Sequence, residues 1–167
     1  MSPSFYPEDG QCRNSYKGCL QAVNGLAATA LETTENQGHL TARTTEYCQD
    51  KLEQLLALSY NDSTSNTAVI PTASTGGNGL TIGGSSSTSS PVAGYLDYLD
   101  SSGNILTFSG TAALANWFYK RVWSVAAGTA DAVNTKVITV TTVVNNQVSA
   151  VGGLPKSTVA ALKVNPF

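Results

Sequence analysis

The chain has 167 residues, which fits one domain and leaves no room for two large ones. Hydrophobic residues make up 41%, enough for a core, whereas only 12% are charged, about half the usual share. The net charge of −2 argues against a nucleic-acid groove, which needs a basic stripe, and we expect no nucleic-acid partner. A single histidine, His39, argues against a histidine metal site and a Ser-His-Asp apparatus, so we expect no enzyme, cofactor or metal.

The polar surface must come from hydroxyls and amides, because Ser and Thr together number 38. Such a composition is typical of secreted and cell-surface proteins. No run of about 18 apolar residues is present, so no segment is expected to span a membrane. Met1 is followed by Ser2, Pro3 and Ser4 rather than by a basic region and an apolar run, so no signal peptide is expected.

Residues 1–24 read as an irregular segment broken by Pro and Gly, and residues 25–167 as one globular domain. From about Gly25 to Leu58 the pattern predicts one long helix. Its apolar and small residues recur at three- and four-residue steps: Leu26, Ala27, Ala30, Leu31, Thr34, Leu40, Thr44, Cys48, Leu52, Leu55 and Leu56.

The helix is expected to have two roles: packing on the sheet and contact with other subunits. The span Leu40 to Leu58 has the stronger stripe and should pack on a sheet, with Leu52, Leu55 and Leu56 in the core. At 1.5 Å per residue the whole helix is about 50 Å long, which is too long for a domain of this size to cover. Four residues on this face are the predicted contacts with other subunits: Leu26, Leu31, Leu40 and Thr44.

Three cysteines, at positions 12, 19 and 48, match no zinc-binding spacing. In an oxidising compartment we expect Cys12 to bridge Cys19, with Cys48 buried and free. A Cys19–Cys48 bridge and three reduced thiols are the alternatives.

Residues 61–94 form a low-complexity stretch in which Gly, Ser, Thr and Asn supply 23 of 34 positions. A segment of this composition buries too little apolar area to offset its ordering entropy, so a long loop is predicted. Val69-Ile70 and Leu80-Thr81-Ile82 are the places where it could be pinned.

The remainder predicts strands. Residues 95–99 and 105–108 flank a Gly-containing turn and indicate a hairpin. Residues 117–125 and 136–144 alternate and should pair antiparallel, and residues 157–164 give a last strand. In the predicted strand 117–125, the side chains on one face are those of Trp117, Tyr119, Arg121, Trp123 and Val125. We therefore predict an α+β fold, with one long N-terminal helix packed on an antiparallel meander of about four strands.

Two segments resemble a known family. Tyr47 to Tyr60 contains the run K-L-E-Q-L-L-A-L-S-Y, which resembles the end of the first helix in PilV-type minor pilins. The segment Tyr119-x-Arg121-x-Trp123-x-Val125, followed by Lys136-x-Ile138-Thr139-Val140-Thr141, resembles the strand pair of the same family. The I-type minor pseudopilins of type II secretion share much of this plan. The resemblance covers roughly residues 25–164.

The resemblance implies a pilin-like fold whose N-terminal half-helix is apolar and membrane-embedded. It also implies other minor and major pilins and the inner-membrane assembly machinery as partners. The prepilin cleavage site, apolar run and glutamate of the family are absent, and polar residues 1–24 stand there instead. The expectation is a chain without its membrane anchor, or else a natural split subunit whose helix comes from another chain. Contact with the membrane would be made only through that missing helix.

Other candidate sites have simpler structural interpretations. Arg121 and Trp123 could form a ligand platform, but a structural pair that holds the sheet is the preferred interpretation. Asp97, Asp100 and Asn104 could offer oxygens to calcium, whereas a hairpin turn needs the same residue types for its backbone geometry.

Three further features carry little chemistry. His39 has no acid or cysteine at catalytic spacing. Asp50 and Glu53 fall on the solvated helix face, where a carboxylate pair lacks the burial needed for acid-base tuning. Asn61-Asp62-Ser63 fits a glycosylation acceptor, a tripeptide that also arises by chance.

The resemblance thus implies a minor pilin or pseudopilin that helps filament assembly at or near the tip. It also implies a location at the cell surface, with the globular domain periplasmic before assembly. An adhesin-like surface-binding module is the alternative, and a small secreted enzyme is the third class.

Overall fold

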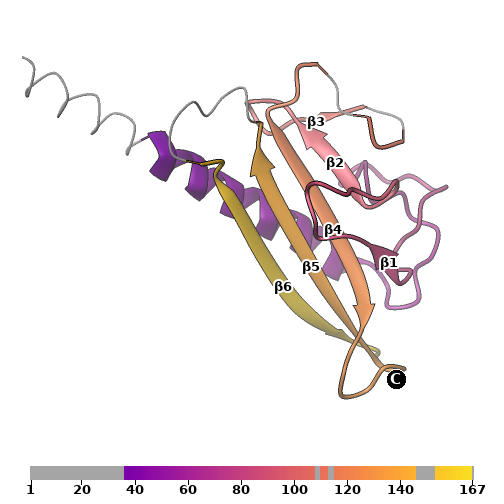
Figure 1. The fold of residues 1–167 in the computed structure, drawn as a ribbon. Helices are drawn as coiled ribbons and strands as arrows, with labels where there is room; N and C mark the ends of the chain where they lie inside the picture. Colours follow the sequence, from indigo (N-terminus) through magenta and orange to yellow (C-terminus); the bar gives the residue numbers. More distant parts are fainter. Residues whose placement is uncertain (1–35, 108–109, 113–114, 146–152, 167) are drawn as a thin grey trace, which may run out of the picture. The chain divides into compact units, whose positions relative to one another are not determined.

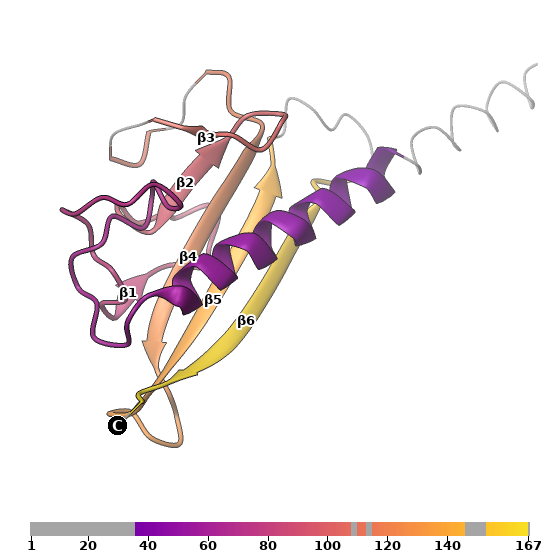
Figure 2. The same cartoon turned by 180° about the vertical axis from the view of Figure 1, so that it is seen from behind.

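The computed structural model describes residues 36–107, 110–112, 115–145 and 153–166. This part of the chain contains one helix, residues 36–57, packed on a six-stranded antiparallel sheet, so the predicted α+β class is confirmed (Figures 1 and 2). The strands are β1 (Gly83–Gly84), β2 (Leu96–Leu99), β3 (Ile105–Leu106), β4 (Tyr119–Ala127), β5 (Thr135–Val144) and β6 (Lys156–Val164).

The strand order is β3-β2-β4-β5-β6, with β1 beside β4. The prediction of a simple meander is wrong in one respect, because β4 pairs with β2 and not with β3. The short β3 folds back on the outer edge of β2 and leaves the inner edge of β2 free for β4. β1 and β2 then share one edge of β4, with β2 along residues 119–122 and β1 along 124–125.

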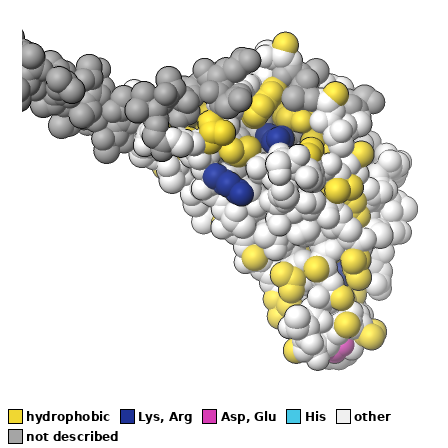
Figure 3. Space-filling view, viewed as in Figure 1, with side chains coloured by type: hydrophobic (Ala, Val, Ile, Leu, Met, Phe, Trp, Pro, Cys, Tyr) yellow, Lys and Arg dark blue, Asp and Glu magenta, His cyan; other side chains and the backbone are white. Residues whose placement is uncertain are grey.

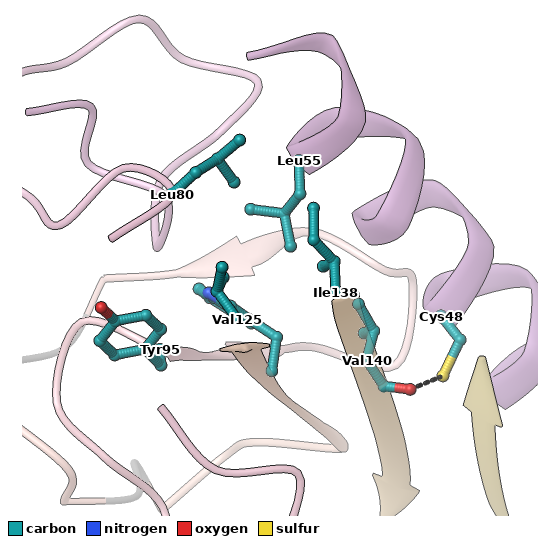
Figure 4. Packing of buried hydrophobic residues seen from close by; sticks show 8 residues of the cluster. Cys48, Leu55, Leu80, Tyr95, Val125, Ile138 and Val140 are labelled. Carbon is teal, nitrogen blue, oxygen red and sulfur yellow. Dashed lines mark hydrogen bonds between the residues drawn. The ribbon is translucent and has the colours of Figure 1, made fainter. Parts of the chain in front are cut away.

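The helix lies along one face of the sheet and supplies the main core. Alternate side chains of β4 point toward it, since successive strand residues face opposite sides. Figure 4 shows part of this core, where Leu55 of the helix lies near Val125 and Ile138. The buried members of the cluster are Cys48, Leu55, Leu80, Tyr95, Trp123, Val125, Ile138 and Val140.

The other face of the sheet is covered at β2 and β4. Leu96, Tyr98 and Val122 are buried there, and Trp117 packs against them. The expectation that Trp117 shares a face with Tyr119 and Trp123 is therefore wrong. β4 begins only at Tyr119, so the strand alternation does not extend back to Trp117.

The helix is tied to β6 at two well-separated points. The hydroxyls of Thr44 and Thr45 lie 2.8 and 2.9 Å from Ser157 Oγ at the start of β6. Lys163 Nζ, at the end of β6, donates to the carbonyl of Leu56 at 2.6 Å. The helix and β6 therefore run in the same direction. The predicted helix residues 25–35 lie outside the described residues.

The loop 61–94 is mostly irregular, as expected for its composition, but it is fixed at several points. Asp62 Oδ1 accepts from the backbone N–H groups of Thr64 and Ser65, and the Leu80 N–H donates to the Asp62 carbonyl at 2.7 Å. Leu80 is fully buried in the core, whereas Ile82 is exposed. The loop also supplies β1, which the sequence did not predict.

Within the described residues the one helix does not combine the length and apolarity that a bilayer crossing requires.

Candidate functional site

Lys51 occupies the apolar face of the helix. It follows Cys48 by three residues and precedes Leu55 by four, and both of these residues are fully buried. Residues at this spacing lie on the same face of a helix, so Lys51 is buried against the sheet with them. Its ammonium lies 2.8 Å from Asp97 Oδ2 and 4.5 Å from the centre of the Trp123 ring, and it donates to the carbonyl of Thr67. The side chain has no exposed surface.

Asp97 lies on β2 and Arg121 directly opposite on β4, which places both side chains on the helix-facing side. Arg121 Nε donates to Asp97 Oδ1 at 2.7 Å, and Arg121 Nη2 to Asp97 Oδ2 at 2.8 Å. This is a bidentate pair, the strongest geometry for these two groups. Arg121 Nη1 also reaches the carbonyl of Tyr47 at 3.4 Å, so the guanidinium joins β2, β4 and the helix.

One buried carboxylate thus faces two cations. Burial alone would raise the pKa of Asp97, but the charges of Arg121 and Lys51 outweigh it and hold that pKa below its ordinary value. For Lys51, burial and the neighbouring Arg121 outweigh the attraction of Asp97, so its pKa is lowered. Asp97 is the group that permits both cations to be buried.

The contacts of Lys51 decide its chemistry. A lysine with a lowered pKa is a candidate nucleophile when a substrate can reach its amine. Here the ammonium is in contact with Asp97, the Thr67 carbonyl and the Trp123 ring. In this arrangement the Lys51–Asp97–Arg121 cluster holds the helix on the sheet.

A groove lies beside the cluster, between the helix, loop residues 69–74 and the β2–β3 turn. Its cavity of about 760 Å³ is large enough for a small ligand. A second cavity of about 790 Å³ adjoins it and shares the lining residues Gln54, Pro71, Thr72, Ala73 and Ser74. Gln54 Oε1 is a buried acceptor that has no hydrogen-bond partner among the described residues. Arg121, Tyr47 and Asp50 reach the first cavity.

The predicted subunit contacts fall in different places. Leu26 and Leu31 lie outside the described residues, as do Cys12 and Cys19. Leu40 is half-buried against Tyr47, Leu99, Tyr119 and Val144. Thr44 is fully buried beside Ser157 and is engaged within the chain. Its contact with another subunit stays a prediction.

Arg121 and Trp123 are both buried on the helix-facing side of β4. Their main contacts are with other residues. Arg121 forms an ion pair with Asp97, and the cation that lies over the Trp123 ring is the ammonium of Lys51. Cys48 is a free, buried thiol whose sulfur lies 3.0 Å from Thr142 Oγ1, 3.2 Å from the Ser157 carbonyl and 3.7 Å from the Val140 carbonyl, and burial raises its pKa.

The three oxygen-bearing residues considered for calcium do not converge. Asp97 points into the core, whereas Asp100 accepts from the N–H groups of Ser102 and Asn104 and from the Asn104 side chain. These are hydrogen bonds of a turn. Over the described ranges, no group of three His, Cys, Asp or Glu side chains could hold a metal ion.

Sequence reasoning missed Lys51 and Asp97 as members of one cluster. The available signal was a charged residue at a core-facing position in each element: Lys51 between Cys48 and Leu55, and Asp97 within Tyr-Leu-Asp-Tyr-Leu. Each of these charges needs a buried partner of opposite sign.

Comparisons with protein-family models, with curated proteins and with solved structures found no match for this chain.

Proposed function

We propose that this chain is a PilV-type minor pilin or a related pseudopilin, a structural subunit in the assembly of a type IV pilus or a type II secretion pseudopilus. The observation that carries the proposal is the contact between the two segments of the resemblance. Tyr47 of the helix segment stacks edge-on against Tyr119 of the strand segment, with ring centres 4.9 Å apart. Lys51 and Arg121, one from each segment, share Asp97.

This contact supports the proposal because it gives several residues of both motifs a physical role. The helix motif supplies Tyr47, Lys51 and Leu55, and the strand motif supplies the surface on which they pack. A subunit of this kind works by assembly: its helix packs against sibling helices while the sheet and loop 61–94 face outward. Its partners would be other minor and major pilins and the inner-membrane assembly machinery.

The test is made in the source cell with the full native gene product. We expect a pull-down with mass spectrometry to recover other pilins, and deletion of the gene to reduce surface filaments counted by electron microscopy. Complementation with Leu31→Lys should fail to restore filaments. Complementation with Glu53→Lys, a substitution at an exposed position on the helix, should restore them.

Recovery of no pilin, together with unchanged filament numbers after deletion, would refute the subunit role. A complementation in which Leu31→Lys and Glu53→Lys behave alike would refute the assigned helix contact.

The second candidate is a cell-surface binding module, and the groove favours it. The two adjoining cavities and the unpartnered Gln54 Oε1 are features of a site that could accept a hydrogen-bond donor from a ligand. This candidate predicts that Gln54→Ala abolishes binding of the purified chain to target cells and leaves filament numbers unchanged. Unaltered cell binding by Gln54→Ala would exclude the groove as the binding site.

A further inference from the structure

β6 ends the sheet and has one edge without a strand partner in the part of the chain that the structure describes. Its nine residues all pair with β5 on one side. At the opposite end of the sheet, β3 is only two residues long. Alternate N–H and C=O groups of β6 therefore point outward along a long edge, where a further strand could accept and donate hydrogen bonds.

Proteins usually guard such an edge with charges, proline or a bulge. Between Ser157 and Leu162, β6 has no charged residue, no proline and no glycine. Of its two lysines, Lys163 reaches over to the carbonyl of Leu56 and is held at the helix. Lys156, at the start of the strand, is then the one charged residue of β6 that could disfavour pairing with another strand.

The side of β6 that faces away from the helix is apolar toward its end. Leu162 and Val164 are 59% and 54% exposed, and Val133 in the β4–β5 turn is 78% exposed. The N–H of Asn165 donates to the carbonyl of Asn134 at 2.8 Å, which holds the end of β6 beside this turn. Figure 3 shows hydrophobic side chains gathered at one end of this face, near the turn between β4 and β5.

We propose that β6 is a docking edge for β6 of a second copy of this chain, paired antiparallel about a two-fold axis at Ala160. This register uses all nine residues of both strands. It places Ala160 opposite Ala160, Thr158 opposite Leu162, and Lys156 opposite Val164. No two like charges meet, and the apolar end of each strand lies against the aliphatic stem of Lys156 of the other.

Strand length, charge and strand geometry together select the register, since a shift by two residues would leave two residues of each strand unpaired. A shift by one residue toward the start of the strand would place Lys156 opposite Lys163 twice, and like charges directly opposite each other are destabilising. A shift by one residue in either direction would also turn the second copy over, because adjacent residues face opposite sides of a strand. In the centred register both helices remain on one face of a continuous sheet.

Cysteine cross-linking tests the register. The background is the full chain with Cys12→Ser and Cys19→Ser, which leaves only the buried Cys48. Ala160→Cys should give a disulfide-linked dimer under mild oxidation, because residues opposite each other have Cα atoms about 4.5–5.5 Å apart, within reach of a disulfide. Circular dichroism identical to that of the unmodified chain shows that the fold is retained.

Thr158→Cys is the matched control, since it is an exposed position two residues away on the same face of β6. In the proposed register, position 158 lies opposite position 162, so the two introduced thiols are about 13 Å apart along the strands and cannot bridge. Equal cross-linking of both variants, or none of Ala160→Cys, would overturn the proposal. A strand from a different protein as the true occupant would give the second of these results.

Sedimentation of the otherwise native chain gives an independent measurement. We expect a concentration-dependent monomer–dimer equilibrium. Leu162→Lys, at an exposed position, should raise the dissociation constant about ten-fold or more, because it places a second ammonium diagonal to Lys156 of the other copy. A chain that stays monomeric at the highest soluble concentration, or an unchanged constant for Leu162→Lys, would also refute it.

Discussion

Asp97 is the only anion in contact with two buried cations in the described core. Its two oxygens are shared between Arg121, in a bidentate pair, and Lys51. Loss of one member of a buried ionic group costs more than the group contributes as a whole, because the remaining charges stay in a medium that solvates them poorly. Asp97 therefore makes a large contribution to the stability of the helix–sheet contact.

We predict that Asp97→Asn lowers the free energy of unfolding by about 3 to 5 kcal/mol. The substitution keeps the shape of the side chain and removes its charge, so Lys51 and Arg121 face each other without compensation. Urea denaturation followed by circular dichroism measures the change.

Asp50→Asn is the control for the loss of a carboxylate. Asp50 is exposed on the same helix that carries Lys51, and the change should stay within about 0.5 kcal/mol. Similar effects of the two substitutions would contradict the role of the buried cluster.

The same cluster predicts a pH dependence. The pKa of Asp97 is lower in the folded than in the unfolded chain, where it is near 3.8. The stabilisation is therefore fully present above about pH 4 and is lost as the pH falls through the folded pKa. The difference in unfolding free energy between the native chain and Asp97→Asn should shrink below pH 4. A constant difference from pH 7 down to pH 2 would be inconsistent with an ionised Asp97.

The residues of the cluster show what sequence could predict about the site. The alternation of β4 correctly placed Arg121 on the same side as Trp123, because strand geometry requires it. The partner of Arg121 could not be read in the same way. Asp97 becomes its neighbour only because β4 pairs with β2 rather than with β3, and that choice depends on the tertiary arrangement.

At the scale of elements, the helix is held by the surface it buries as well as by charge. Leu55 is fully buried in the main cluster, which also contains Leu80 of the loop. We predict that Leu55→Ala lowers the free energy of unfolding by about 3 to 5 kcal/mol, since it removes apolar contact and leaves a cavity. Val133→Ala, at a position 78% exposed, should change it by less than about 0.5 kcal/mol. Denaturant titration of both variants distinguishes core packing from a general effect of losing methyl groups.

β1 can lie close to β4 and Tyr95 because its two glycines have no side chains. At Gly84, φ is +80°, and a Cβ would lie 2.4 Å from the carbonyl oxygen of Trp123 and 2.7 Å from the Tyr95 ring. We predict that Gly84→Ala costs more than about 2 kcal/mol, because strain and overlap add together. Gly110→Ala is the control, since Gly110 has a φ of +70° with open space around it, and should cost about 1 kcal/mol. Equal thermal unfolding shifts for the two variants would show that overlap plays no part.

The helix and strands differ in how well they can be predicted from their sequences. The helix and the three long strands follow from apolar periodicity, and the structure places β4, β5 and β6 within two residues of the expected bounds. β1 could not be found this way because Gly-Gly has no side chains to give a period, and its place is set by close approach to β4. The sequence suggested Leu80 as a residue that anchors the loop, because it is apolar. The hydrogen bonds of Asp62 depend on the backbone conformation of the loop and were not predicted.

At the scale of the molecule from residue 39 onward, the ties between the helix and β6 determine how it would bear load. Thr44 and Thr45 meet Ser157 at one end, and Lys163 meets Leu56 at the other. A tension applied at the start of the helix and at the end of β6 would act along both elements and in opposite senses. These contacts and the core between them would then be sheared together rather than opened one after another. The resistance to such a tension would therefore be set by the helix–sheet contact as a whole, because its hydrogen bonds and packing would have to fail together.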